Sequence, residues 1–191
     1  MVRTAAVAVV VVLAAVGFTA AALLVRPAGT PGSTPGTASS TMKLTSSAFS
    51  ENGNIPTKYT ADGINVSPPF QISGVEPMAA TLAIVVEDLD AGNFTHWIIW
   101  NIPPNTENIP EDLQNSQILE GTSAKEGRND FGSIAYSGPD PPAGPAHSYR
   151  FKLLALNSTL SLASGSTKSQ FDQAISGHVI AEATLTGKYG R

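Results

Sequence analysis

Two short stretches place acidic and histidine side chains at the ends of predicted strands. Asp88 and Asp90 follow directly on the β-branched run TLAIVV, and His96 opens the next apolar run, HWIIWNI, six residues later. The short connection predicts antiparallel neighbours, which would bring His96 close to the two carboxylates. Carboxylates beside an imidazole would orient it and raise its pKa, so that it donates hydrogen bonds more strongly.

A second stretch, residues 127–149, is rich in glycine and proline and ends with His147 and Tyr149. These two residues are separated by one position, which puts them on the same face of a strand. Proline in the GPDPP segment stiffens the loop before them. Imidazoles, a phenolic hydroxyl and glycine-rich backbone amides are donors suited to phosphate or carboxylate oxygens. This stretch therefore predicts one wall of a binding site, with donors that suit a small anion.

Other polar residues in these regions have simpler structural interpretations. His178 follows Gly177, which is expected to end a helix, and would bond the last carbonyls of that helix. Asp130 is expected to pair with Arg128 or to cap backbone amides. Two segments, NFT at residue 93 and NST at residue 157, match glycosylation acceptors, and both are interpreted as unmodified.

Paired carboxylates beside histidines could also belong to an enzyme. Such an enzyme would use acid/base catalysis or a bound zinc or iron ion. The chain has no nucleophile elbow, no H-E-x-x-H motif and no cysteine. The sequence therefore favours a binding protein without catalytic residues, bound metal or cofactor.

The composition excludes several classes of protein. Hydrophobic residues make up 42% of the chain and charged residues only 14%, which is typical of a globular protein. The net charge is −4, and every acidic residue lies after position 50. An acidic domain is not expected to bind nucleic acid. Without cysteine, the chain forms no disulfides and no zinc–thiolate sites.

The amino-terminal part has a different composition from the rest. Residues 5–25 are 21 consecutive uncharged and mostly apolar residues, and roughly 20 such residues span a bilayer as a helix. Residues 1–26 are predicted to be a signal peptide or a transmembrane anchor. Residues 27–41, PAGTPGSTPGTASST, are predicted to be a flexible linker. The domain of residues 42–191 would then be extracytoplasmic and membrane-anchored, or secreted.

Within that domain, the hydrophobic patterns favour strands. Runs of strand length occur at residues 81–86, 96–102 and 149–156. Residues 178–189 alternate, with Val179, Ala181, Ala183 and Leu185 expected on the buried face. One helix is predicted from about residue 167 to residue 176. The fold class is therefore mainly β with one or two helices.

At this point the motifs resemble those of the phosphatidylethanolamine-binding proteins, especially the bacterial and archaeal branch called Raf kinase inhibitor-like. The resemblance is carried in order by NGNIPTKYTADGINVSPPF, VVEDLDAGNFTHWIIWNIP, EGRNDFGSIAYSGPDPPAGPAHSYRFKLLALN and GHVIAEATLTGKYGR. It implies two antiparallel β-sheets, a few peripheral helices and an anion pocket at one end. Here this fold would follow the hydrophobic amino-terminal helix.

The resemblance also assigns residues to the pocket. The family's D-P-D-A-P loop falls on residues 88–92, its first histidine on His96, its G-P-x-P-P loop on residues 138–142 and its H-x-Y on His147 and Tyr149. Leu89 and Gly92 replace prolines, and Asp140 stands where relatives often have cysteine. The predicted ligand-binding residues are Asp88, Asp90, His96, Gly138, Asp140, Pro141, Pro142, His147 and Tyr149.

The expected function is the binding of a small anion such as phosphate, phosphorylethanolamine or a carboxylate, with an effect on partners. The family name also suggests inhibition of a protease or a kinase, although an exported domain would rarely meet a cytosolic kinase. No motif predicts a particular protein partner, and a homodimer stays an open alternative.

Overall fold

The computed structural model describes residues 41–113 and 121–191, which form two β-sheets, one α-helix and a short 3₁₀ helix at Thr57–Tyr59. The first sheet has three strands in the order β1-β3-β6 and the second has six in the order β2-β9-β8-β4-β5-β7. The strands are β1 Lys43–Thr45, β2 Gly53–Asn54, β3 Phe70–Ser73, β4 Thr81–Asp88, β5 Phe94–Ile102, β6 Asn108–Ile109, β7 Lys125–Glu126, β8 His147–Leu156 and β9 Val179–Tyr189, and the helix is α1 Lys168–Ile175.

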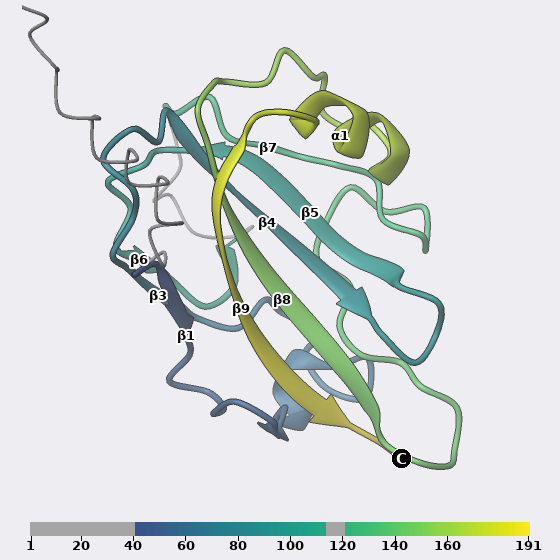
Figure 1. Cartoon of the computed structure of the whole chain (residues 1–191). Helices are drawn as coiled ribbons and strands as arrows, with labels where there is room; N and C mark the ends of the chain where they lie inside the picture. Colours follow the sequence, from purple (N-terminus) through teal and green to yellow (C-terminus); the bar gives the residue numbers. More distant parts are fainter. Residues whose placement is uncertain (1–40, 114–120) are drawn as a thin grey trace, which may run out of the picture. The chain divides into compact units, whose positions relative to one another are not determined.

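The mainly β prediction is confirmed, with one refinement of the pairing. Strands β4, β5, β8 and β9 run side by side as antiparallel neighbours (Figure 1). The edge strand β2 pairs with β9 in parallel, so the larger sheet is mixed rather than purely antiparallel. This parallel pair is only two residues long, which a sequence pattern does not reveal.

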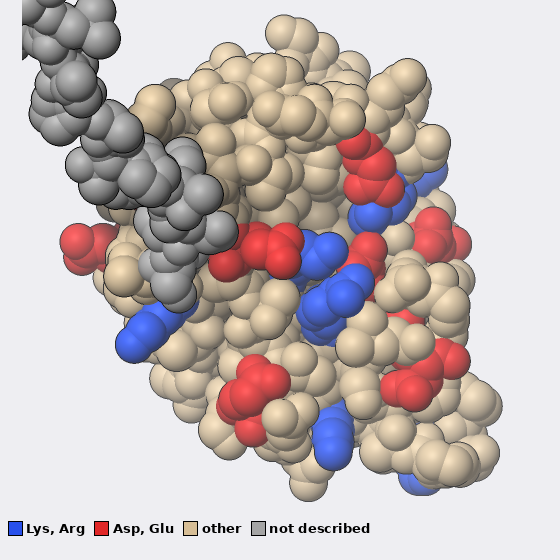
Figure 2. All heavy atoms as spheres, in the orientation of Figure 1, with Lys and Arg blue, Asp and Glu red and all other residues tan. Residues whose placement is uncertain are grey.

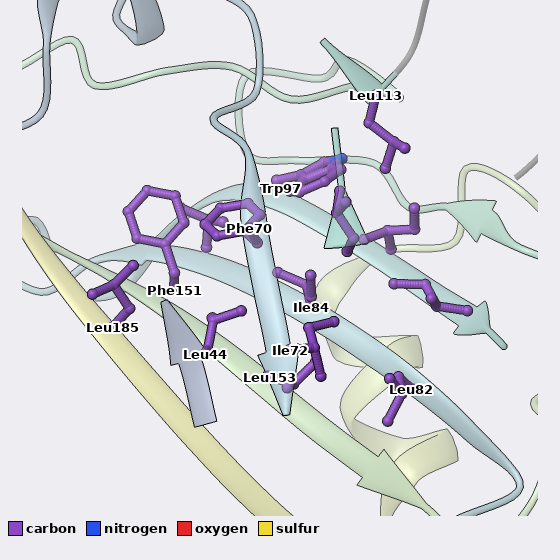
Figure 3. Packing of buried hydrophobic residues seen from close by; sticks show 14 of the residues in the cluster. Leu44, Phe70, Ile72, Leu82, Ile84, Trp97, Leu113, Phe151, Leu153 and Leu185 are labelled. Atoms are coloured by element: carbon purple, nitrogen blue, oxygen red, sulfur yellow. The ribbon is translucent and has the colours of Figure 1, made fainter. Parts of the chain in front are cut away.

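Strand β4 is the centre of the domain because all eight of its residues are buried. On one face, Ile84 and Val86 belong to the main hydrophobic cluster with Phe70 and Phe151 (Figure 3). On the other face, Ala83 and Val85 belong to a second cluster that includes Phe171 of α1. Apolar contacts on both faces explain why its sequence is a continuous β-branched run rather than an alternating one.

Helix α1 begins where the sequence predicts it, because Thr167 and Gln170 form a capping box. It ends before Gly177, whose φ of 78° is readily adopted by glycine. The backbone amide of His178 donates to the Ile175 carbonyl at 2.9 Å, as expected for its position. The imidazole, however, contacts Asn157 Oδ1 at 2.8 Å and not the helix carbonyls.

The predicted inner face of β9 is correct for Ala181 and Leu185 and wrong for Val179, which is 40% exposed. The cause is a β-bulge. Ala155 pairs with Ala181, but the next residue of β8, Leu156, pairs with Val179, so Ile180 is the extra residue. A bulge interrupts the alternation of faces, and the pattern fails beyond it.

The predicted signal peptide or anchor of residues 1–26, and the linker of residues 27–41 except its last position, lie outside the described residues. In the described ranges, no helix combines the length and the apolar character needed to cross a membrane. On the face drawn in Figure 2, acidic and basic side chains are intermixed rather than gathered into one large basic patch.

Candidate functional site

Strand register brings four of the predicted residues together at one end of the larger sheet. Asp88 is the last residue of β4 and pairs with Tyr149 of β8. His147 opens β8, and His96 is the third residue of β5, the neighbour of β4 on its other side. The His96 and Tyr149 rings meet edge-on at 5.2 Å between centroids, and those of His147 and Tyr149 stack at 6.4 Å. We call Asp88, His96, His147 and Tyr149 the site cluster.

Asp88 is buried and holds His147 in one orientation. Its Oδ1 accepts from the backbone amides of Asp90 at 2.9 Å and Ala91 at 3.2 Å, which fixes the carboxylate in the turn after β4. Its Oδ2 lies 2.8 Å from Nδ1 of His147, whose side chain is 19% exposed. A carboxylate only accepts hydrogen bonds, so this contact puts a proton on Nδ1 of His147.

His96 is oriented by backbone carbonyls rather than by the carboxylates. Its Nδ1 lies 2.7 Å from the Ser137 carbonyl oxygen and 3.2 Å from that of Gly138, so Nδ1 is again the protonated nitrogen. The side chain belongs to a residue only 2% exposed. Burial lowers the pKa of His96, and this outweighs the Ser137 and Asp88 contributions that raise it. The predicted upward pKa shift is therefore wrong for His96, which stays neutral at pH 7.

Tyr149 supplies a buried hydroxyl next to the Asp88 carboxylate. The residue is 0% exposed, and its hydroxyl makes no hydrogen bond of normal geometry with any described residue. Burial, the negative charge of Asp88 and a hydrogen bond to its carboxylate that falls outside normal geometry raise the pKa of Tyr149, so the hydroxyl keeps its proton. A buried donor without a well-formed hydrogen bond costs up to about 1–3 kcal/mol, which a ligand acceptor would recover.

Asp90 does not join the site cluster in the role that its spacing predicted. Its side chain turns to the strand backbone, where Oδ2 accepts from the Ser148 amide at 2.7 Å. The bond ties the turn after β4 to the start of β8. An exposed carboxylate that is already committed to a backbone amide supports the turn rather than an imidazole, so its predicted orienting role is wrong.

The loop from Gly138 to Pro142 lies against His96 through its first residue. The Gly138 amide donates to Asn65 Oδ1 at 2.7 Å, and a Cβ at this position would stand 2.2 Å from the Tyr59 carbonyl oxygen, so only glycine fits. Pro141 is buried, whereas Pro142 is exposed. The Asp140 carboxylate accepts from Arg191 Nη2 at 2.6 Å, so its charge is paired.

Several residues beside His96 carry no role in the sequence-based prediction of the site. Asn129 is buried and its Nδ2 donates to the His96 carbonyl at 3.2 Å and to Ser137 Oγ at 2.9 Å. Phe131, 46% exposed, meets the His96 ring edge-on at 5.2 Å. Their position within the turn-rich, charged segment of residues 127–132 was the only available signal.

Asp130 has the amide-capping role that was one of its two expected roles. Its Oδ2 accepts from the Thr95 amide at 2.7 Å, and Arg128 donates instead to the Gly132 carbonyl at 2.7 Å. The cap joins the 127–132 segment to β5 one residue before His96.

Among the described residues, no group of three or more His, Asp or Glu side chains is arranged to hold a metal ion.

Comparison with known proteins gives a consistent family. Residues 45–190 match the family model described as phosphatidylethanolamine-binding protein. The chain is 45% identical over 154 residues to a UPF0098 protein of Pyrococcus abyssi, covering 78% of this chain and 86% of that protein. It is 42% identical over 152 residues to a UPF0098 protein of Methanothermobacter thermautotrophicus, covering 78% of this chain and 99% of that protein.

Two solved structures have the same fold. One is described as a phosphatidylethanolamine-binding protein homolog from Chlamydia trachomatis, with a TM-score of 0.70, 38% identity and coverage of 80% of this chain and 99% of that one. The other is E. coli YbcL, described as a member of the mammalian PEBP family, with a TM-score of 0.72, 28% identity and coverage of 78% and 98%. On the family match, the sequence identities and the shared fold, this chain belongs to the phosphatidylethanolamine-binding protein family.

Proposed function

We propose that the site cluster binds a small oxyanion, such as phosphate, a phosphate monoester or a carboxylate, and that the protein works by binding rather than by catalysis. The observation that carries this proposal is the buried Tyr149 hydroxyl, which keeps its proton and makes no hydrogen bond of normal geometry with a described residue, although the Asp88 carboxylate lies close enough to help raise its pKa. Two imidazole rings pack against the same tyrosine ring. An anionic oxygen is the acceptor that such a donor lacks.

The hydrogen bonds that Asp88 already makes favour a binding function over acid/base catalysis. Its Oδ1 accepts two backbone amides and its Oδ2 is paired with His147. A carboxylate held in this way orients its partner, and it is poorly placed to take a proton from a substrate.

The tautomers of the two histidines make anion binding depend on protonation. Nδ1 of His147 donates to Asp88 and Nδ1 of His96 donates to carbonyl oxygens. In a neutral imidazole the second nitrogen, Nε2, carries a lone pair and cannot donate to an oxyanion. An imidazole that takes up a proton donates from both ring nitrogens, so its Nε2 can then donate to the anion. We therefore expect binding of a fully deprotonated anion to take up a proton.

Sulfate is the probe that tests this proposal, because it remains deprotonated at neutral and mildly acidic pH. Its affinity is expected to rise as the pH falls from about 8 to about 6, by at most roughly tenfold per pH unit for one proton. Isothermal titration calorimetry in buffers of different ionisation enthalpy would measure the proton uptake directly. His178→Gln is the matched control, because His178 contacts Asn157 outside the site cluster. Absence of sulfate binding, or binding with no proton uptake, would contradict the proposal.

We also propose that the domain is exported, as a membrane-anchored or secreted protein. The basis is the run of 21 uncharged residues at positions 5–25, followed by a Pro/Gly/Ser/Thr-rich segment. An anchored full-length chain is expected to sediment with membranes, to resist extraction by salt and to be released by detergent, whereas a cleaved chain would appear in the secreted fraction. Recovery of the intact chain in the cytoplasmic fraction alone would contradict export.

A further inference from the structure

Arg191 binds two carboxylates and a carbonyl from separate loops. Its Nε lies 2.7 Å from Asp62 Oδ2, and its Nη2 lies 2.6 Å from both Asp62 Oδ1 and Asp140 Oδ1. Its Nη1 donates to the Pro141 carbonyl at 3.0 Å. Tyr189 donates to Asp62 at 2.7 Å. We call Arg191, Asp62, Asp140 and Tyr189 the arginine cluster.

The arginine cluster adjoins the site cluster through two independent connections. Tyr189 pairs directly with His147 across β8 and β9, so the two side chains lie on the same face of the sheet. Asp140 comes two residues after Gly138, whose carbonyl oxygen contacts His96. The segment from Ser137 to Pro141 is therefore held by His96 at one end and by Arg191 at the other.

The charge of Asp140 acts on the site cluster. The negative charge of Asp140 is among the influences that raise the pKa of Tyr149, after burial and the influence of Asp88. A carboxylate close enough to affect the Tyr149 hydroxyl would also repel an anion bound to that hydroxyl. In this structure the guanidinium of Arg191 compensates that charge at 2.6 Å.

We propose that Arg191 is a positioning residue of the anion site, which permits anion binding by neutralising the Asp140 carboxylate beside it. This inference rests on the proposed anion-binding function. The Arg191–Asp140 ion pair, which lies outside the site cluster, would then contribute to the affinity of the site for an anion. The Asp140 carboxylate would otherwise compete as a negative charge beside the ligand.

The test is sulfate titration by calorimetry at low ionic strength with four variants and one control variant. Arg191→Gln removes the compensating charge and is expected to weaken sulfate binding by about five- to tenfold, the size of a partly screened charge interaction. Asp140→Asn in the same chain removes the repelling charge, so the double variant is expected to bind within about twofold of wild type. Asp140→Asn alone should bind as tightly as wild type or more tightly.

Arg191→Lys separates charge from shape, because it keeps the positive charge and loses the planar fork. It should retain most of the affinity, and the defect of Arg191→Gln should shrink as salt is added. Lys125→Gln is the matched control for loss of one positive charge. Lys125 lies in β7 opposite Trp100 of β5, which is four residues along the strand from His96, so Lys125 is outside the site cluster. Thermal melts of every variant would report any loss of folding.

The possible outcomes separate the two proposals. If wild type binds sulfate and Arg191→Gln binds equally well, the role of Arg191 is wrong and the anion-binding function stands. If the double variant binds as weakly as Arg191→Gln, the charge of Asp140 is not the cause and the inference is overturned. If wild type does not bind sulfate, the proposed function and this inference both fail.

Discussion

Replacing Asp88 with alanine is expected to abolish measurable sulfate binding, a loss of more than about tenfold, or about 1.4 kcal/mol. The change removes the acceptor that orients His147 at 2.8 Å. It also frees the amides of Asp90 and Ala91, so the turn after β4 is expected to loosen. Calorimetric titration at mildly acidic pH, where wild type should bind best, measures the loss.

A second substitution at the same position separates charge from geometry. Asp88→Asn keeps an oxygen for the two turn amides but carries no negative charge, so proton uptake should disappear and affinity should fall between wild type and Asp88→Ala. Asp172→Asn serves as the control, because Asp172 pairs with Lys168 on α1. Sulfate affinity in Asp88→Ala equal to that of wild type would show that the site cluster is not the binding site.

Replacing Asn101 with alanine is expected to lower the free energy of unfolding by about 3–5 kcal/mol. Asn101 is buried in β5 with a φ of 58°. Its side-chain amide makes two hydrogen bonds with the backbone of Leu160, in the way that a neighbouring strand would. Its Nδ2 donates to the Leu160 carbonyl and its Oδ1 accepts from the Leu160 amide, both at 2.9 Å. Alanine would lose both bonds, leave two backbone groups unpaired and strain the left-handed conformation. Urea unfolding followed by circular dichroism measures the change.

Two further variants divide this loss into its causes. Asn101→Gly removes the same hydrogen bonds but tolerates positive φ, so it should be destabilised by about 1 kcal/mol less than Asn101→Ala. Asn93→Ala carries similar strain, at a φ of 63°, on an exposed residue and should cost only about 1 kcal/mol. If Asn101→Ala were no less stable than Asn93→Ala, the pairing with Leu160 would not be an important interaction.

Local sequence was sufficient for the elements whose stability depends on neighbouring residues. The Thr167–Gln170 capping box starts α1, and Gly177 follows its end, because both signals act within one helical turn. The buried strands β4 and β5 were visible because a strand covered on both faces favours a nearly continuous apolar run. The β9 bulge was not visible, since it depends on register with β8.

The approach of His96 to Asp88 was predicted from the short connection between their strands, and the family resemblance added His147 and Tyr149 to the same pocket. Their residue types and their places at strand ends determined a cluster of hydrogen-bonding groups at one end of the domain. The sequence could not determine the hydrogen-bond partner of each side chain. Asp88 binds His147, whereas Asp90 binds the Ser148 amide, although the two carboxylates are two residues apart.

Only the tertiary structure decided the charge state and the environment of the site. His96 is neutral because burial of its imidazole lowers its pKa by more than the carbonyls of a loop about 40 positions away in the chain raise it. Asp140 is compensated because Arg191 reaches it from 51 residues along the chain. Desolvation and ion pairing depend on distances in space, and residues this far apart in sequence acquire those distances only when the sheets and loops pack.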